Sequence, residues 1–497
     1  AVERARGRGL IESIALDAER IRQGVDAPLL EREREARLAL SAKIDYRVRL
    51  LSLNASKDLV AAAQREIDAL DAEYQVARAR VREASPAYAA LVRPEPLSAE
   101  AVQRSLLDGD TVLVEYLLDE PRSAVWVVTP SGLSSAPLPG RAEVEARVRR
   151  VRELLVARAC TVKNELEEER AARIRRADVE YAAAARELSD MVLGPVARAI
   201  AGKRLAIVAD GALQLVPFDA LPEPGGAGLL VASHEVVMLP SATVLATSRR
   251  ELAERAQAPG AVIALGDPVF EATDERVKRT EASGPITRQR PVPRVLGEGC
   301  EEREGFARLV GSRAEAEAIG KLAPKGASHV ALDFGANLEV ATSGKLGEYR
   351  VVHFATHGYV PSEAPELSGL VLSLVDEAGR ERPGYLGLSE VYNLRLPAEV
   401  VVLSACETGL GKQVRGEGIV GLTRGFMYAG ARRVVVSLWS VDDRATAELM
   451  GRFYRAMLDG RRPPAAALRA AQVSMLKEGA WSFPYYWAAF VVQGEWR

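Results

Sequence analysis

The sequence predicts an α/β fold in which a mainly parallel sheet is flanked by helices and preceded by a helical hairpin. In residues 301–497, short apolar runs alternate with segments of helical periodicity, as strand–helix units require. These runs are apolar without interruption, which is typical of parallel strands buried on both faces. Residues 1–95 instead carry apolar positions at helical spacing, so we expect helices there.

Composition limits the classes of function. The 497 residues allow two to four domains at roughly 150 residues each. A formal charge of −2 gives no global basic field for nucleic acid, and no apolar run reaches the roughly 18 residues of a membrane span. Three cysteines at wide spacing, Cys160, Cys300 and Cys406, predict neither a disulfide framework nor a zinc cluster. A reducing, cytoplasmic location fits this cysteine usage.

The first predicted domain covers residues 1–95 and is a helical hairpin. Apolar residues from Val60 to Val81 recur at spacings of three and four, and an earlier stripe runs from Leu40 to Leu51. The break at residues 53–56 lets the two helices fold back on each other. Prolines at positions 94 and 96 end the region, because proline cannot continue a helix.

The second predicted domain covers residues 97–300. Two β-branched runs at 111–118 and 123–129 flank a short turn and predict a strand hairpin. The charged segment 271–300 is predicted to be an exposed loop or linker. Between the strand hairpin and this loop, we expect helices at 141–200 and buried strands at 204–210 and 261–266.

The third predicted domain, residues 301–497, carries two reactive side chains at strand ends. Strands are predicted at 329–333, 350–356, 370–375, 400–404 and 433–439, and helices at 312–322, 419–428 and 444–477. Ligands bind beyond the carboxyl ends of parallel strands, and His357 and Cys406 each follow such an end. If their strands are neighbours, about 4.8 Å apart, both side chains project into one crevice.

A thiol and an imidazole placed in this way predict a cysteine endopeptidase. The imidazole of His357 generates the thiolate of Cys406, which is the nucleophile, and then protonates the leaving amine. The backbone N–H groups of Gly358 and Cys406 are candidate oxyanion donors. No third catalytic residue is identified from the sequence.

The segments His-Phe-Ala-Thr-His-Gly (353–358) and Leu-Ser-Ala-Cys-Glu-Thr-Gly (403–409) resemble the CHAT family of caspase-like cysteine peptidases, relatives of separase. The resemblance extends over roughly residues 105–497. It implies a caspase-like α/β sandwich with His357 and Cys406 as the dyad and with residues 97–300 as a degenerate companion half. Tetratricopeptide repeats precede the peptidase in many relatives, and residues 1–21 resemble the closing helix of such an array. The resemblance therefore implies missing upstream sequence and an activating protein that acts through it.

The same resemblance places an acidic residue for a basic P1 side chain near Asp442 and Asp443. A bidentate arginine contact would suit such a site. The alternative is that one of these aspartates caps the helix that begins near Arg444, since Asp is strongly preferred there. Both interpretations stay open, because one aspartate can cap while its neighbour lines the pocket.

Other motifs do not predict a metal or a cofactor. His353 and His357 have zinc-like spacing, but on a strand they lie about 13 Å apart, so His353 is predicted to be a core residue. The G-x-G-x-x-G at 416–421 does not directly follow its strand, as a dinucleotide site requires. Residues 409–413 lack the rest of a phosphate-binding loop.

Two competing functions remain at this point. In the first, Cys406 and His357 are structural core residues, and the chain is a catalytically silent caspase-like scaffold or signalling module. In the second, the glycines at 416–421 bind a nucleotide, which predicts stabilisation by NAD or a nucleotide. The peptidase hypothesis instead predicts a protein substrate and a selectively reactive Cys406.

Overall fold

The computed structural model describes most of the chain. The described residues are 25–52, 55–84, 97–160, 162, 164–252, 255–278, 292–293, 303–304, 306–359, 368–404, 412–414, 418–439 and 442–497. Cys300, Cys406 and most of the predicted linker at 271–300 lie outside these ranges.

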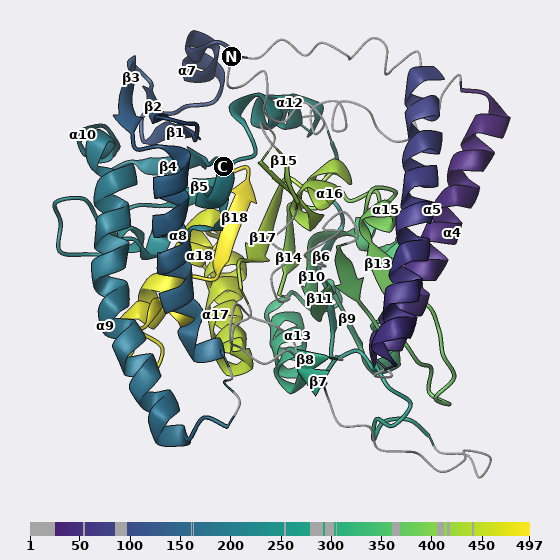
Figure 1. Cartoon of the computed structure of the whole chain (residues 1–497). Coiled ribbons are helices and arrows are strands. Elements are labelled where there is room, and N and C mark those ends of the chain that lie inside the picture. The colour runs from purple at the N-terminus through teal and green to yellow at the C-terminus, as the bar shows by residue number, and fades with distance from the viewer. Residues whose placement is uncertain are drawn as a thin grey trace.

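One eleven-stranded sheet forms the centre of the molecule (Figure 1). Seven of its ten strand pairs are parallel and three are antiparallel, which confirms the mainly parallel sheet. In spatial order the strands are β3 (Gly132–Leu138), β2 (Ser123–Thr129), β1 (Thr111–Leu117), β4 (Arg204–Val208), β5 (Val236–Met238), β18 (Phe490–Gly494), β17 (Arg433–Ser437), β14 (Val400–Leu403), β10 (Tyr349–Ala355), β6 (Gly260–Gly266) and β9 (Ser328–Leu332).

The sheet runs without a break through both predicted sheet-containing units. The C-terminal strand β18 pairs with β17 on one side and with β5 on the other. Likewise β6, which precedes residue 300 in the sequence, lies between β9 and β10. The division into units at 97–300 and 301–497 stays a prediction.

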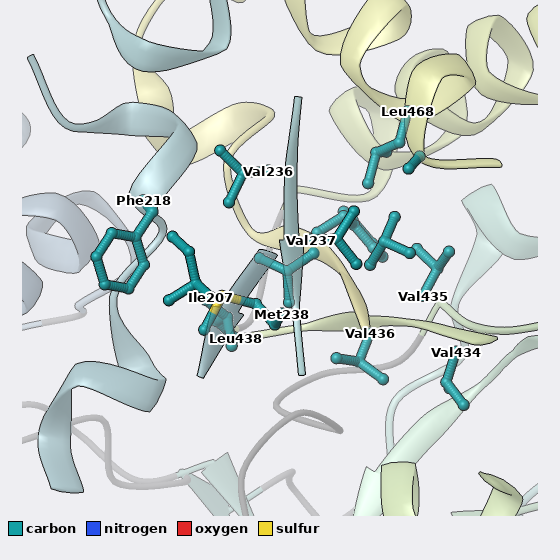
Figure 2. Packing of buried hydrophobic residues seen from close by; sticks show 14 of the residues in the cluster. Ile207, Phe218, Val236, Val237, Met238, Val434, Val435, Val436, Leu438 and Leu468 are labelled. Carbon is teal, nitrogen blue, oxygen red and sulfur yellow. The ribbon is translucent and has the colours of Figure 1, made fainter. Parts of the chain in front are cut away.

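Helices flank this sheet (Figure 1). The longer ones are α8 (Arg141–Val156), α9 (Glu167–Val192), α12 (Ala242–Leu252), α13 (Val310–Leu322), α17 (Asp443–Tyr454) and α18 (Pro464–Leu476). Figure 2 shows part of the apolar core, where Ile207 of β4, Val237 of β5, Val435 of β17 and Leu468 of α18 lie together. Their burial explains why the strand sequences lack polar alternation.

The predicted helical hairpin is confirmed. The helices α4 (Ala27–Ser52) and α5 (Lys57–Ala84) lie side by side at the right of Figure 1, and Lys43 Nζ of α4 is 2.5 Å from Glu66 Oε2 of α5. The hairpin packs against a small sheet formed by β11 (His357–Tyr359), β12 (Gly369–Val371) and β13 (Tyr385–Gly387). They share an apolar cluster that comprises Leu40, Ile44, Val48, Ile67, Tyr74, Phe270, Phe306, Val371, Leu374 and Tyr385.

Several predicted elements differ in extent. The predicted helix at 419–428 begins at Leu422 as α16 (Leu422–Tyr428), because Gly418–Val420 forms β16, which pairs with β15 (Lys412–Val414). The predicted helices between 444 and 477 are present as α17 and α18, and Pro463 and Pro464 start the second of them. The strands β3, β5 and β18 were not predicted from sequence.

Candidate active site

His357 lies directly past the carboxyl end of β10. The buried Thr356 separates it from the strand, and the Thr356 hydroxyl donates a hydrogen bond to the carbonyl oxygen of Val371. His357 then begins β11 and pairs in register with Val371, while Gly358 pairs with Leu370. The turn from the main sheet into the small sheet therefore determines where the imidazole projects.

The imidazole of His357 is bordered by two aromatic rings, and a backbone carbonyl holds its Nε2. Its ring centroid lies 5.2 Å from that of Phe270 and 5.5 Å from that of Phe306. Its Nε2 lies 2.6 Å from the carbonyl oxygen of Ala307. A carbonyl can only accept a hydrogen bond, so Nε2 carries the proton, and in the neutral ring Nδ1 holds the lone pair. Nδ1 is then the nitrogen that can accept a proton.

The chain that leads to Cys406 leaves the sheet beside the chain that leads to His357. The strands β10 and β14 are parallel neighbours, with Phe354 opposite Leu403. The N–H of Ser404 extends this ladder by donating to the carbonyl oxygen of Phe354 at 2.8 Å. The sequence prediction required these two strands to be neighbours, and they are. Cys406 itself lies outside the described residues, so its approach to His357 stays a prediction.

Asp442 caps α17. Its Oδ1 accepts hydrogen bonds from the backbone N–H groups of Arg444 and Ala445 at 2.9 and 3.0 Å. The capping interpretation of this residue is therefore confirmed, although its side chain still reaches the solvent. The cap leaves the predicted role in substrate binding untested.

Asp443 is the first residue of α17 and borders α13. Burial raises the pKa of its carboxyl, and the nearby carboxylates of Glu315 and Asp442 raise it further, against a hydrogen bond from the backbone of Gly311. Part of this residue is open to solvent. Its ionisation is therefore less favourable than that of an isolated aspartate, unless a cation approaches.

His353 is a buried core residue, as the sequence predicted. Its Nδ1 lies 2.9 Å from the hydroxyl oxygen of Tyr454 in α17. Its Nε2 is 3.0 Å from Glu315 Oε1, close enough for an ion pair but not aligned as a hydrogen bond. Among the residues that the structure describes, no three His, Cys, Asp or Glu side chains gather as metal ligands.

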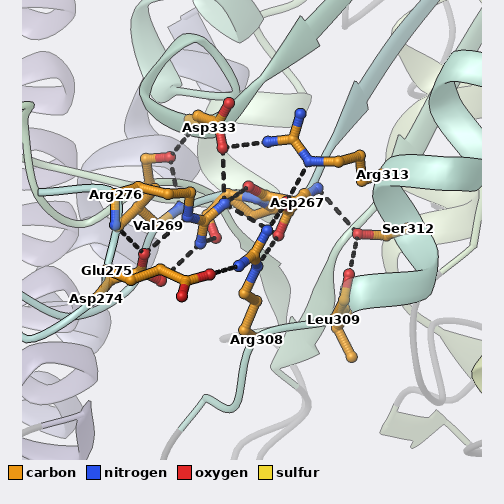
Figure 3. A network of polar contacts seen from close by, with 12 residues as sticks. Asp267, Val269, Asp274, Glu275, Arg276, Arg308, Leu309, Ser312, Arg313 and Asp333 are labelled. Carbon is orange, nitrogen blue, oxygen red and sulfur yellow. Dashed lines mark hydrogen bonds and ion pairs between the residues drawn. The ribbon is translucent and has the colours of Figure 1, made fainter.

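A cluster of charged residues that the sequence did not single out lies at the same edge of the sheet (Figure 3). Asp267 directly follows β6, whose last residue, Gly266, pairs with Ala355 at the end of β10. Its side chain is fully buried. We call the group the Asp267 cluster, and its members are Asp267, Asp274, Arg276, Arg308, Arg313 and Asp333.

Opposite charges in the Asp267 cluster stabilise the ionised form of Asp333. Burial alone raises the pKa of Asp333, but hydrogen bonds from Arg313 and Arg276 outweigh burial and hold this pKa below its ordinary value. The only sequence signal for the cluster is an acidic residue directly after a buried strand. Arg308 and Arg313 come from a segment more than 40 residues away and carry no such signal.

Cys160 takes part in a disulfide, although the sequence predicted no disulfide framework. Its partner lies outside the described residues. Pairing requires two Cα atoms within about 7 Å, a proximity that spacing along the chain does not reveal. Assays of thiol chemistry on this protein therefore need a reductant, and the cytoplasmic location stays a prediction.

Comparison with known proteins agrees with this architecture. The sequence-family model of the CHAT domain matches residues 182–495 of this chain. The human tetratricopeptide repeat protein 28 is 34% identical over 145 residues, which cover 29% of this chain and 5% of that protein. Its mouse counterpart is 36% identical over 109 residues, or 22% of this chain and 4% of that protein. The chain thus matches only a small part of these relatives.

The fold also resembles a solved structure. The structure of the separase–securin complex from Saccharomyces cerevisiae superposes with a TM-score of 0.52 at 10% identity, over 87% of this chain and 34% of that one. Within the described residues, no helix has both the length and the apolar character needed to cross a membrane. With the family model matching more than half of its residues, the chain belongs to the CHAT domain family, and its mixed α/β fold resembles that of the separase chain in this complex.

Proposed function

We propose that this protein is a cysteine endopeptidase in which Cys406 attacks a peptide carbonyl of a protein substrate and His357 transfers the proton. The observation that carries the proposal is the pairing of β10 with β14, which directs the two segments toward the same edge of the sheet. The second observation is the 2.6 Å contact between His357 Nε2 and the Ala307 carbonyl oxygen, which leaves Nδ1 as the basic nitrogen.

The proposed reaction has two stages. His357 Nδ1 takes the proton of the Cys406 thiol, the sulfur bonds to the peptide carbon, and the same nitrogen protonates the departing amine as the C–N bond breaks. A water molecule, deprotonated by His357, then hydrolyses the thioester and regenerates the thiol. We assign the oxyanion to the backbone N–H groups of Gly358 and Cys406, where preorganised donors stabilise the developing charge.

Proteomic profiling of new N-termini tests the proposal. The wild-type protein, Cys406→Ala and His357→Ala are each incubated with cell extract and a reductant, and new N-termini are identified by mass spectrometry. We expect cleavages with the wild type that both variants lack, and Cys300→Ala serves as the matched thiol control. Equal cleavage by the Cys406→Ala protein would exclude the proposed nucleophile.

We further propose a basic P1 residue that is bound by Asp442 or Asp443. Because Asn caps helices as well as Asp does, Asp442→Asn removes the charge and keeps the cap. If Asp442 contacts P1, this variant raises KM for substrates with P1 Arg, whereas substrates with P1 Leu are unaffected. Asp443→Asn is tested in the same way. A wild type that prefers acidic or apolar P1 residues would refute this assignment.

An activating protein acting through upstream helical repeats is part of the same proposal. The hairpin of α4 and α5 shares its apolar cluster with Phe270 and Phe306, the two rings beside His357. A partner that shifts the hairpin would therefore act on the surroundings of the imidazole. The alternative, a catalytically silent scaffold, predicts that Cys406 reacts no faster with alkylating agents than Cys300 does.

A further inference from the structure

Two segments that are distant in the sequence close around His357. Phe270 belongs to the loop after β6, and Phe306 and Ala307 precede α13. Residues 306–309 form neither helix nor strand, so no ladder of backbone hydrogen bonds determines where the Ala307 carbonyl points. Something else has to hold this carbonyl against the imidazole.

The side chain next to Ala307 supplies that restraint. Arg308 donates from Nε to Asp267 Oδ1 at 2.9 Å and from Nη2 to Asp267 Oδ2 at 2.8 Å. Two parallel bonds of this kind restrict the orientation of the guanidinium as well as its distance. The pair, shown in Figure 3, thus ties residue 308 to the loop after β6. In the sequence, Phe270 follows Asp267 by three residues in this loop.

Asp267 is itself held from several directions. Its Oδ2 also accepts from Arg313 Nε at 2.8 Å, and Arg276 Nη1 lies 3.0 Å from its Oδ1. Its backbone N–H donates to Ser312 Oγ at 2.9 Å. Its φ of 47° lies in the left-handed region, which a non-glycine residue occupies only when its surroundings enforce it. Asp267 is therefore a rigid anchor.

We infer that the ion pair between Arg308 and Asp267 positions His357 for catalysis by holding the Ala307 carbonyl against Nε2. This inference rests on the proposed peptidase function. Without Arg308 the carbonyl is free to turn away, Nε2 loses its acceptor, and the proton redistributes between the two ring nitrogens. The lone pair of Nδ1 is then no longer reliably available to the thiol.

The structure also provides a variant that acts locally. Arg308→Gln leaves Asp267 paired with Arg276 and Arg313, so no buried charge loses all its partners. Asp267→Asn would instead leave three arginines around a neutral amide, and breaking buried pairs in that way is strongly destabilising. The matched control is Glu275→Gln, because exposed Glu275 contacts Arg308 Nη1 at 2.6 Å without touching Asp267.

The experiment measures the alkylation rate of the Cys406 thiol and the tautomer of the His357 imidazole separately. Iodoacetamide alkylation of Cys406 is followed by residue-resolved mass spectrometry at near-neutral pH with a reductant. The tautomer of His357 is read from ¹⁵N chemical shifts of labelled histidine and assigned with His357→Gln. We expect the Nε2–H form in the wild type and in Glu275→Gln. In Arg308→Gln we expect mixed tautomers and alkylation about tenfold to a hundredfold slower, as for a misplaced catalytic group.

Each outcome decides between the two proposals. If His357→Ala alkylates as fast as the wild type, the dyad itself fails. If His357→Ala is slow but Arg308→Gln keeps the wild-type rate and tautomer, only the positioning inference fails. If circular dichroism shows that Arg308→Gln is unfolded, the same measurements are made on Arg308→Lys, which retains a cation but cannot form the two parallel bonds. An intermediate rate with mixed tautomers supports the inference, and wild-type behaviour overturns it.

Discussion

Asp45→Asn tests how the helical hairpin is held against the small sheet that carries His357. Asp45 lies in α4 with only 6% of its surface exposed, and its Oδ1 accepts from the backbone N–H of Tyr385 in β13 at 3.1 Å. Burial raises the pKa of Asp45 to about 6, against hydrogen bonds from the backbone of Tyr385 and Gly384 and the charge of Arg49. The hairpin therefore meets the sheet through a carboxylate that is costly to ionise.

The sign and size of the effect follow from proton linkage. The unfolded chain releases the Asp45 proton near pH 3.8, whereas the folded chain keeps it until about pH 6. In this window the folded state binds more protons, so its stability falls as pH rises. At about 1.4 kcal/mol for each pH unit, the total cost approaches about 3 kcal/mol above pH 6. Asparagine keeps a carbonyl acceptor for Tyr385 and never ionises.

We therefore expect Asp45→Asn to be more stable than the wild type at pH 7.5, by about 2–3 kcal/mol, with the difference shrinking toward pH 4. This difference in stability is measured by urea unfolding at a series of pH values, together with hydrogen exchange of peptides from α4 and β13. Asp68→Asn is the matched control, because Asp68 is exposed on α5 and its loss changes stability little. A variant less stable than the wild type at pH 7.5, or a pH-independent difference, would refute the reasoning.

Three further predictions concern stability. Burial raises the pKa of Asp219 to about 7, so Asp219→Asn should raise Tm relative to the wild type at pH 8 and lose this advantage near pH 4; an advantage that does not change with pH would contradict this. Tyr454→Phe removes the hydroxyl beside His353 Nδ1 and should cost about 1–3 kcal/mol in urea unfolding, and an unchanged midpoint would argue against that bond. Asp442→Ala should cost about 0.5–2 kcal/mol while Asp442→Asn costs little, and equal losses would exclude capping as the cause.

The sequence could predict those elements that depend on residues close to one another along the chain. The strands that lead to His357 and Cys406 lie within one residue of their predicted ends, because β-branched runs bounded by turns define buried strands. The cap formed by Asp442 was among the predicted alternatives, because it involves residues only two and three positions away. Prediction was wrong for residues 419–420, where pairing with β15 outweighs the helical pattern.

The sequence by itself determined which residue types end the strands, and hence the candidate dyad of His357 and Cys406. Only the tertiary structure decided what surrounds the imidazole. The Ala307 carbonyl is 50 residues from His357, and Arg308 is 41 residues from Asp267. A carbonyl oxygen is present at every residue, and an arginine is typical of any surface. Their roles arise because β6 and β10 are neighbours, and neighbouring strands bring together loops that no local pattern connects.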